Sequence, residues 1–155
     1  MASSMFHRIT VAVDGSQHAN EALDIAIDLA RRYGSDLSIL AVAPLTPIYV
    51  APNEPFVASQ VSPSDLPRYQ AIVESAVKRA EGAGVTSVSG ICTDGVVADE
   101  ILGHLEENPS DLLVIGSRGL SAAKRLLLGS VSTAMVNHAP CPVLVVRPSV
   151  TKPAA

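Results

Sequence analysis

The stretch Asp111-Leu112-Leu113-Val114-Ile115-Gly116-Ser117-Arg118-Gly119 decides the fold class. It is an uninterrupted apolar run that ends in a glycine turn, which is typical of a strand buried on both faces of a parallel sheet. Nine residues later, Gly129-Ser130-Val131-Ser132 opens a predicted helix over residues 130–138. Backbone N–H groups at a glycine turn and at a helix N-terminus bind anions. The stretch therefore predicts an α/β protein with an anion pocket, and a nucleotide is the leading candidate for its ligand.

Apolar periodicity alternates between the strand pattern and the helix pattern along the chain. The predicted strands cover residues 6–13, 37–42, 85–91, 111–115 and 142–146. The predicted helices cover residues 17–33, 65–81, 130–138 and a segment that begins near residue 96 and ends at residues 108–109. Strands that alternate with helices imply right-handed βαβ units and a parallel sheet. We therefore expect one doubly wound, five-stranded parallel sheet with helices on both faces.

Length and proline content set the expected domain organisation. The chain has 155 residues, 48% hydrophobic and only 3% aromatic, which suits a single domain over residues 1–155 with a core of Val, Leu, Ile and Ala. Six of the 11 prolines fall within residues 44–67, where they remove backbone donors and break periodicity. We therefore expect a long proline-rich loop over residues 44–67 and a frayed tail over residues 148–155.

Charge and cysteine content argue against several functional classes. The formal net charge of −4 disfavours general nucleic-acid binding, because phosphate backbones require a basic face. Cys92 and Cys141 lie far apart in the chain and are interpreted as reduced thiols. No apolar run approaches the roughly 20 residues of a membrane span, and residues 1–8 lack the apolar region of a signal peptide. A soluble cytoplasmic protein with no membrane span is expected.

Two turns at the carboxyl ends of predicted strands carry the chemistry. Asp14-Gly15-Ser16 follows the first strand, and the Gly116 turn follows the fourth. In doubly wound sheets, ligands bind beyond the carboxyl ends of the strands where the strand order reverses. If the first and fourth strands are neighbours, both turns border one crevice. Arg118, Lys124 and Arg125 add positive charge there in an otherwise acidic chain, which favours a negative ligand.

Other interpretations of these residues were weighed. Gly116 and Gly119 could serve only a tight turn that needs a positive φ. A phosphoacceptor role for Asp14, as in response-regulator receivers, needs an acidic pair there and a lysine after the last strand, but no lysine follows until Lys152. The chain lacks the Walker A, Gly-x-Gly-x-x-Gly and Gly-x-Ser-x-Gly motifs. The histidines have no metal-ligand spacing and are interpreted as capping or surface residues: His7, His18, His104 and His138.

The glycine spacing makes the chain recognisable. Gly116-x2-Gly119-x9-Gly129-Ser130, preceded by the apolar run 111–115 and followed by residues 137–146, resembles the universal stress protein family. The opening Ile9-Thr10-Val11-Ala12-Val13-Asp14-Gly15-Ser16 resembles the first strand and turn of the same family. The resemblance covers the chain from about residue 6 to residue 147. It implies an adenine nucleotide α-hydrolase-like sheet with strand order 3-2-1-4-5, and the spaced glycines mark the branch of the family that binds ATP.

The resemblance also implies which residues contact the nucleotide. The backbone of Ala12 and Val13, with Val42, would frame the adenine. Asp14 would lie near the ribose or near a phosphate-bound Mg²⁺ ion, which it would hold indirectly. The other implied contacts lie in the two glycine segments, where they would approach or hold the ribose and phosphates: Ile115, Gly116, Arg118, Gly119, Gly129, Ser130, Val131 and Ser132.

We expect a nucleotide-binding protein rather than an efficient enzyme. Phosphoryl transfer needs positioned cations and a group that orients the nucleophile, and Asp14 is the only carboxylate that the pattern places in the site. The favoured function is an ATP-binding stress-response or regulatory module with slow or no ATP hydrolysis. The alternatives are a slow ATPase or phosphotransfer enzyme, and a dimerisation module that binds no nucleotide. ATP with Mg²⁺ is the expected ligand, and AMP and cyclic AMP stay open.

The last strand, residues 142–147, is expected to mediate association. It is apolar on both faces and falls at an edge in a doubly wound order, and exposed apolar edges tend to find partners. The resemblance implies that this strand pairs antiparallel with its own copy in a homodimer. Protein partners are expected for a regulatory module, but the sequence names none.

Overall fold

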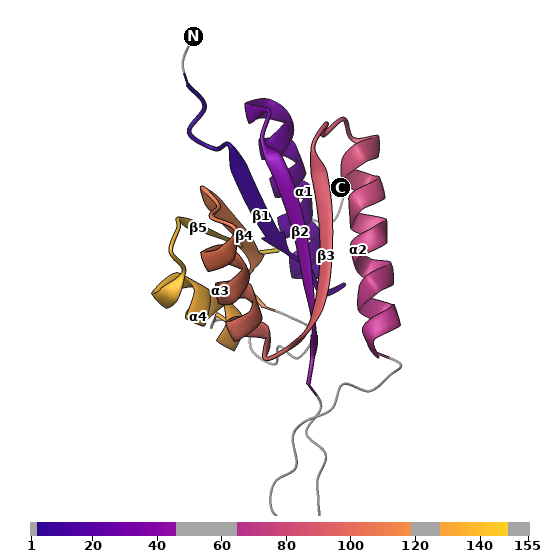
Figure 1. Ribbon diagram of the computed structural model, residues 1–155, viewed down its shortest axis with the longest axis vertical. Helices are drawn as coiled ribbons and strands as arrows, with labels where there is room; N and C mark the ends of the chain where they lie inside the picture. Colours follow the sequence, from indigo (N-terminus) through magenta and orange to yellow (C-terminus); the bar gives the residue numbers. More distant parts are fainter. Residues whose placement is uncertain (1–2, 46–64, 119–127, 149–155) are drawn as a thin grey trace, which may run out of the picture.

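The computed structural model describes residues 3–45, 65–118 and 128–148 (Figure 1). The elements are β1 Arg8–Ala12, α1 Gln17–Tyr33, β2 Asp36–Pro44, α2 Asp65–Gly82, β3 Val88–Gly95, α3 Val97–Glu107, β4 Leu112–Gly116, α4 Ser130–His138 and β5 Val143–Val146. The strands run parallel in one sheet with the order β3-β2-β1-β4-β5. The predicted doubly wound, five-stranded sheet and its strand order are confirmed.

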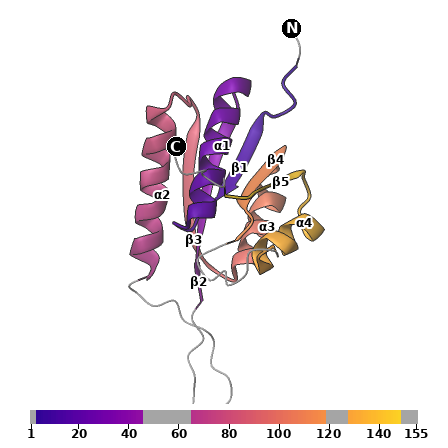
Figure 2. The same ribbon diagram turned by 180° about the vertical axis from the view of Figure 1, so that it is seen from behind.

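Helices cover both faces of the sheet, so the described residues form three layers. α1 and α2 lie on one face, and α3 and α4 lie on the other (Figures 1 and 2). Successive residues of a strand point to opposite faces. In β4, Leu112 and Val114 therefore pack toward α1 and α2, whereas Leu113 and Ile115 pack toward α3 and α4. Strand β4 is buried along its whole length, as its uninterrupted apolar run predicts.

Short polar and glycine caps set the ends of α1. Ser16 is the N-cap, and its Oγ accepts a hydrogen bond from the Ala19 N–H at 3.2 Å. Gly34 ends the helix in the left-handed region with a φ of 66°, where glycine has no Cβ to crowd the backbone. The predicted helix over residues 17–33 is confirmed. None of the helices in the described segments is long and apolar enough to cross a membrane.

Strand β3 is displaced toward the C-terminus relative to the prediction of 85–91. Its pairing with β2 runs from Val88 to Gly95. Val85 donates its N–H to the Ala80 carbonyl at 3.1 Å, which closes the end of α2 across Gly84, whose φ is 98°. The Val85 side chain is buried in the core. The apolar residue at position 85 is thus a helix-end contact, and the prediction that it starts a strand is wrong.

The predicted loop over residues 44–67 is shorter at both ends. Pro44 belongs to β2, and residues 65–67 form the first turn of α2. Proline is tolerated in the first turn of a helix because the N–H groups there have no intrahelical partner. Pro67 therefore lies inside α2, and the predicted helix over residues 65–81 is confirmed. Residues 46–64 and the tail 149–155 lie outside the described residues.

Helix α2 packs closely on β3 at Gly90. A Cβ atom at this position would lie 2.5 Å from Val73 Cγ1 and 2.8 Å from Val77 Cγ2. Both distances are far below the van der Waals contact of two carbon atoms. Glycine at position 90 is therefore what allows α2 to lie this near to the sheet.

Asp111 joins the starts of β1 and β4. Its Oδ2 accepts the backbone N–H groups of His7 and Arg8, each at 2.8 Å. The bonds from Arg8 and His7 lower the pKa of the Asp111 carboxyl below its ordinary value of 3.8. A carboxyl with a lowered pKa stabilises the fold above its ordinary pKa, because the unfolded chain takes up the proton first as the pH falls. We therefore expect this contribution to be lost as the pH falls below the ordinary value.

Urea denaturation of an Asp111→Asn variant measures this contribution. Near neutral pH the variant is expected to be less stable than the native chain, and near about pH 3 the difference is expected to shrink. Glu106→Gln removes an exposed carboxyl from α3 and serves as the control, with a small difference at both pH values. An Asp111→Asn difference that is the same at both pH values would contradict the assignment.

Candidate functional site

The two predicted turns leave the same edge of the sheet. β1 and β4 are neighbours and run parallel, so their carboxyl ends lie at the same edge of the sheet (Figure 1). Gly116 is the last residue of β4, and Asp14 comes two residues after the end of β1. The Gly129 N–H donates to the Ser117 carbonyl at 2.8 Å, which brings the start of α4 to this edge as well. The structure thus brings together the three segments that the sequence pattern assigns to one site. Ligands of doubly wound sheets bind at this edge.

The turn over Asp14–Ser16 is fixed by its own side chains. Asp14 Oδ1 accepts the Ser16 N–H at 2.9 Å, a bond typical of aspartate turns. Gly15 has a φ of 82°, which glycine adopts without strain. The turn also packs against α2, because a Cβ at Gly15 would lie 3.0 Å from Ile72 Cδ1. Asp14 thus commits one carboxylate oxygen to the turn, and the other can accept a hydrogen bond from a hydroxyl group or a metal-bound water.

Ser117 is the junction of the site. Its N–H donates to the Val146 carbonyl of β5 at 2.8 Å, and its carbonyl accepts the Gly129 N–H at 2.8 Å. The same carbonyl accepts the Ser132 hydroxyl at 2.9 Å. The Ser117 Oγ forms a hydrogen bond of 2.8 Å with His18 Nδ1. Ser117 follows β4 and is only 5% exposed, so α1, β4, β5 and α4 are joined at one buried residue.

The N-terminus of α4 presents backbone donors. Gly129 is the N-cap, and no side chain among the residues that the structure describes caps this end. The Thr133 N–H donates to the Gly129 carbonyl at 3.0 Å, so the N–H groups of residues 130–132 precede the first bond of the helix. Ser130 is exposed and Val131 is half-buried. Donors at the positive end of a helix dipole favour an anion.

Two predicted ligand contacts have structural roles. The Ser132 side chain is buried, and its hydroxyl lies 2.9 Å from the Ser117 carbonyl oxygen and 3.0 Å from the Gly129 carbonyl oxygen. It therefore joins α4 to the turn that begins at Gly116 and continues through Ser117, which we call the β4 turn. Gly116 packs against α1, because a Cβ there would lie 2.8 Å from the His18 carbonyl carbon. Helix packing requires glycine at position 116, whatever ligand is bound.

The apolar members of the predicted site can form hydrogen bonds only through their backbone. Val13, Val42 and Ile115 have buried side chains in the two cores. The Val13 N–H already donates to the Leu40 carbonyl at 2.9 Å. Ala12 is half-buried at the end of β1. Any hydrogen bond of these residues with a ligand is therefore restricted to their remaining backbone groups.

The basic part of the predicted site is described only at its start. Arg118 follows Ser117 and is half-buried. Gly119, Lys124 and Arg125 lie outside the described residues.

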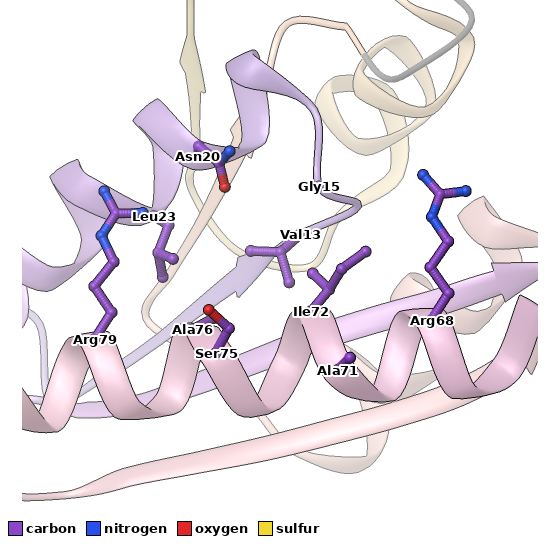
Figure 3. A pocket seen from close by; sticks show the side chains of 10 residues that line it. All are labelled: Val13, Gly15, Asn20, Leu23, Arg68, Ala71, Ile72, Ser75, Ala76 and Arg79. Carbon is purple, nitrogen blue, oxygen red and sulfur yellow. The ribbon is translucent and has the colours of Figure 1, made fainter.

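A cavity of about 360 Å³ lies between α1 and α2, beside the Asp14–Ser16 turn (Figure 3). Its lining is apolar in the middle and has an arginine at each end along α2: Val13, Gly15, Asn20, Leu23, Arg68, Ala71, Ile72, Ser75, Ala76 and Arg79. Arg79 forms an ion pair with Asp24 of α1. Val13 is the only predicted nucleotide contact among these described residues, so the cavity lies beside the predicted site and not within it.

His18 and Ser117 lie at the candidate site, and the sequence analysis assigned a role there to neither. The absence of metal-ligand spacing led to the prediction that His18 is a capping or surface residue. The structure instead places its ring against Ser117, which is 99 positions away in the chain. One signal was available, because His18 lies in the first turn of the helix that follows the Asp14 turn. That position puts it at the carboxyl edge of the sheet.

Metal-binding and thiol chemistry find little support in the described segments. No group of three or more His, Cys, Asp or Glu side chains within them could hold a metal ion. Cys92 and Cys141 are free. Burial raises the pKa of both thiols, which keeps them protonated near neutral pH.

The chain matches a known protein family over nearly its whole length. The model of the universal stress protein family matches residues 5–147. The chain belongs to this family. Universal stress protein YxiE of Bacillus subtilis (strain 168) is 38% identical over 153 residues, which cover 92% of this chain and 100% of the relative.

Solved structures of universal stress proteins share the fold. Universal stress protein UspA from Lactobacillus plantarum is similar with a TM-score of 0.78 and 23% identity, over 92% of this chain and 98% of that one. A universal stress protein crystallised in complex with cAMP is similar with a TM-score of 0.69 and 29% identity, over 93% of this chain and 98% of that one. The universal stress protein fold of this chain thus places the Asp14 turn, Ser117 and the start of α4 at one edge.

Proposed function

We propose that this universal stress protein binds ATP at the carboxyl edge of its sheet and acts as a nucleotide-dependent stress-response or regulatory module. One observation carries the proposal. Hydrogen bonds of Ser117 hold the N-terminus of α4 against the turn that follows β4, and this turn lies next to the Asp14 turn of β1. The N–H groups of residues 130–132 would hold the phosphates. Asp14 would face the ribose. A cytoplasmic location and further protein partners belong to the same proposal.

An adenine nucleotide is the ligand class with the most support. The relative crystallised with cAMP is 29% identical to this chain. The glycine spacing at residues 116, 119 and 129 favours ATP, and AMP and cyclic AMP are alternatives within the class. The adenine would lie against the backbone of Ala12, Val13 and Val42. A Mg²⁺ ion would be held mainly by phosphate oxygens, which it prefers together with water, and Asp14 would reach it through water.

Slow or no hydrolysis is part of the proposal. Phosphoryl transfer needs a group that orients the attacking nucleophile. The Asp14 carboxylate is tied to the Ser16 N–H at 2.9 Å, which suits a fixed binding contact better than a base that exchanges protons with water. ATPase or phosphotransfer activity is the alternative function, and phosphate release under saturating ATP distinguishes the two.

Two measurements test the proposal. The first is mass spectrometry of nucleotide released from the purified protein, and the second is calorimetric titration with ATP, AMP and cyclic AMP with and without Mg²⁺. A Ser130→Asp variant locates the phosphates. An aspartate at an exposed first helical position stabilises the helix dipole yet repels phosphate, so we expect ATP binding to weaken about tenfold or more, which corresponds to about 1.4 kcal/mol. Asn137→Asp makes the same charge change at the exposed far end of α4 and is the matched control.

The outcomes separate the candidate functions. ATP binding that weakens in the Ser130→Asp variant but not in the Asn137→Asp variant supports the proposed site. Equal affinities in both variants would mean that the phosphates lie elsewhere. No nucleotide in the purified protein and no binding in the titration would favour the dimerisation module.

Association through β5 is the second candidate function. β5 forms one edge of the sheet, and Leu144 in its middle is 37% exposed. An exposed apolar strand edge is a template for pairing with another chain. The proposed homodimer would pair β5 antiparallel with its copy and cover this edge.

Leu144→Lys is expected to convert this dimer to a monomer, because the interface would bury an unpaired charge. Light scattering measures the mass. Leu144 is a better test position than Val145, because Val145 packs against the core under α3 and α4 and a lysine there would also destabilise the monomer. Thr133→Lys, at an exposed position of α4, is the control. A dimer of unchanged mass in the Leu144→Lys variant would contradict pairing through β5.

A further inference from the structure

The first turn of α1 lies directly against the end of β4. A Cβ at Gly116 would lie 2.8 Å from both the carbonyl carbon and the Cβ of His18, so the two backbones are in close contact. The side chain of His18 is half-buried, and its Nδ1 forms a hydrogen bond of 2.8 Å with Ser117 Oγ. His18 thus contacts the β4 turn through both its backbone and its ring.

Every polar group of Ser117 is engaged. Its N–H bonds to Val146, and its carbonyl accepts the Gly129 N–H and the Ser132 hydroxyl. These bonds hold the backbone of the turn between β5 and α4. The Oγ bond to His18 is the one that ties the turn to α1, on the opposite face of the sheet from α4. Without it, the side chain of Ser117 would be a buried hydroxyl with an unmade bond, which is unfavourable.

We propose that His18 is a positioning residue for nucleotide binding, which acts through Ser117 to hold the β4 turn and the N-terminus of α4 in the geometry that receives the phosphates. The inference rests on the proposed nucleotide site. Its physical basis is pre-organisation, because a turn that is already ordered before the ligand arrives loses less entropy on binding. His18 need not touch the nucleotide for this effect.

The test is a set of variants at one position whose ATP affinities are measured by calorimetry. His18→Ala removes the bond, and we expect ATP binding to weaken about fivefold to tenfold. This factor corresponds to the usual contribution of one hydrogen bond to stability. His18→Asn restores a polar atom at the place of Nδ1, and we expect an affinity within about twofold of the native chain. His18→Gln is the matched control, since its amide reaches the place of Nε2 and should not rescue binding.

A double-mutant cycle with Ser117→Ala assigns the effect to this pair. The single variants His18→Ala and Ser117→Ala should weaken ATP binding by similar factors, and the double variant should lose no more than either single variant. The unfolding midpoint of each variant is measured in parallel. If the role of His18 were only structural, the unfolding midpoint would fall in all variants, and ATP binding would not differ between the asparagine and glutamine variants.

Three outcomes would overturn the inference: native ATP affinity in the His18→Ala variant, equal rescue by asparagine and glutamine, and additive losses in the cycle. If the native chain itself binds no nucleotide, the proposed function fails instead. The pair is then tested by the same cycle on the free energy of unfolding, where additive losses overturn the His18–Ser117 coupling and non-additive losses support it.

Discussion

Gly116→Ala is expected to lower the free energy of unfolding by about 3 kcal/mol, the upper part of the range for forcing an extra carbon into a packed core. The added Cβ would lie 2.8 Å from the His18 carbonyl carbon and 3.0 Å from the Ala19 nitrogen. Both atoms belong to the backbone of α1 and cannot turn away as a side chain can. The whole helix or the end of β4 must shift. Urea denaturation followed by circular dichroism measures the loss, which corresponds to a fall in melting temperature of about 6–12 °C.

Gly129→Ala is the control within the same motif. A Cβ at Gly129 would make an ordinary contact of 3.4 Å with the Ser117 carbonyl oxygen, and its φ of −65° suits any residue. We expect a smaller loss of about 1 kcal/mol, because the added methyl group meets no clash and the cost is that alanine is a poorer N-cap than glycine. If Gly116→Ala left stability unchanged and abolished only nucleotide binding, the packing role of Gly116 would be refuted.

Gly90→Ala is expected to lower the free energy of unfolding by about 2 kcal/mol. Its Cβ would lie 2.5 Å from Val73 Cγ1 and 2.8 Å from Val77 Cγ2. A valine side chain has one strongly preferred rotamer in a helix, so neither group can rotate away without strain, and α2 must move off β3. Thermal or urea denaturation measures the loss.

Two further variants check the cause of this loss. Gly103→Ala places a methyl group where nothing lies within 4 Å, inside α3. It should therefore raise stability by about 0.5–1 kcal/mol, the difference in helix propensity. Val77→Ala combined with Gly90→Ala should cost less than the sum of the two single variants, because the second change makes room for the first. Additive losses of stability would show that contact between the new Cβ at position 90 and Val77 is not the cause of the Gly90→Ala effect.

Periodicity predicted the sheet well because burial is decided by the alternation of side chains along each element. The run 111–115 is apolar at every position, and the structure buries β4 on both faces. The pattern was wrong at Val85 because a buried valine after a glycine can either close a helix or start a strand, and the apolar pattern is the same in both cases. Here it closes α2. The predicted helix start at residue 65 is confirmed although Pro67 follows it, because proline is tolerated in the first turn of a helix.

The chemistry of the site was less predictable than the fold. The sequence marks Gly116 and Gly129 as one motif, yet the first is required by the backbone of α1 and the second begins α4. Residue type alone cannot separate these reasons, since glycine occupies both positions. The bond between His18 and Ser117 joins residues 99 positions apart, and no local pattern reports such a contact. The roles of Asp14 and of residues 130–132 toward a nucleotide stay predictions.

The N–H of Ser117 is bonded to the last residue of β5, while its carbonyl is bonded to the first residues of α4. Ser117 therefore belongs both to the hydrogen bonds that join β4 to β5 and to those that hold the N-terminus of α4. If the N-terminus of α4 binds the phosphates as proposed, a partner that orders β5 would also order this end of α4, and by linkage the nucleotide would strengthen binding of that partner by the same factor. Binding of a nucleotide at the carboxyl ends of the strands would then be detected in β5 as slower amide hydrogen exchange.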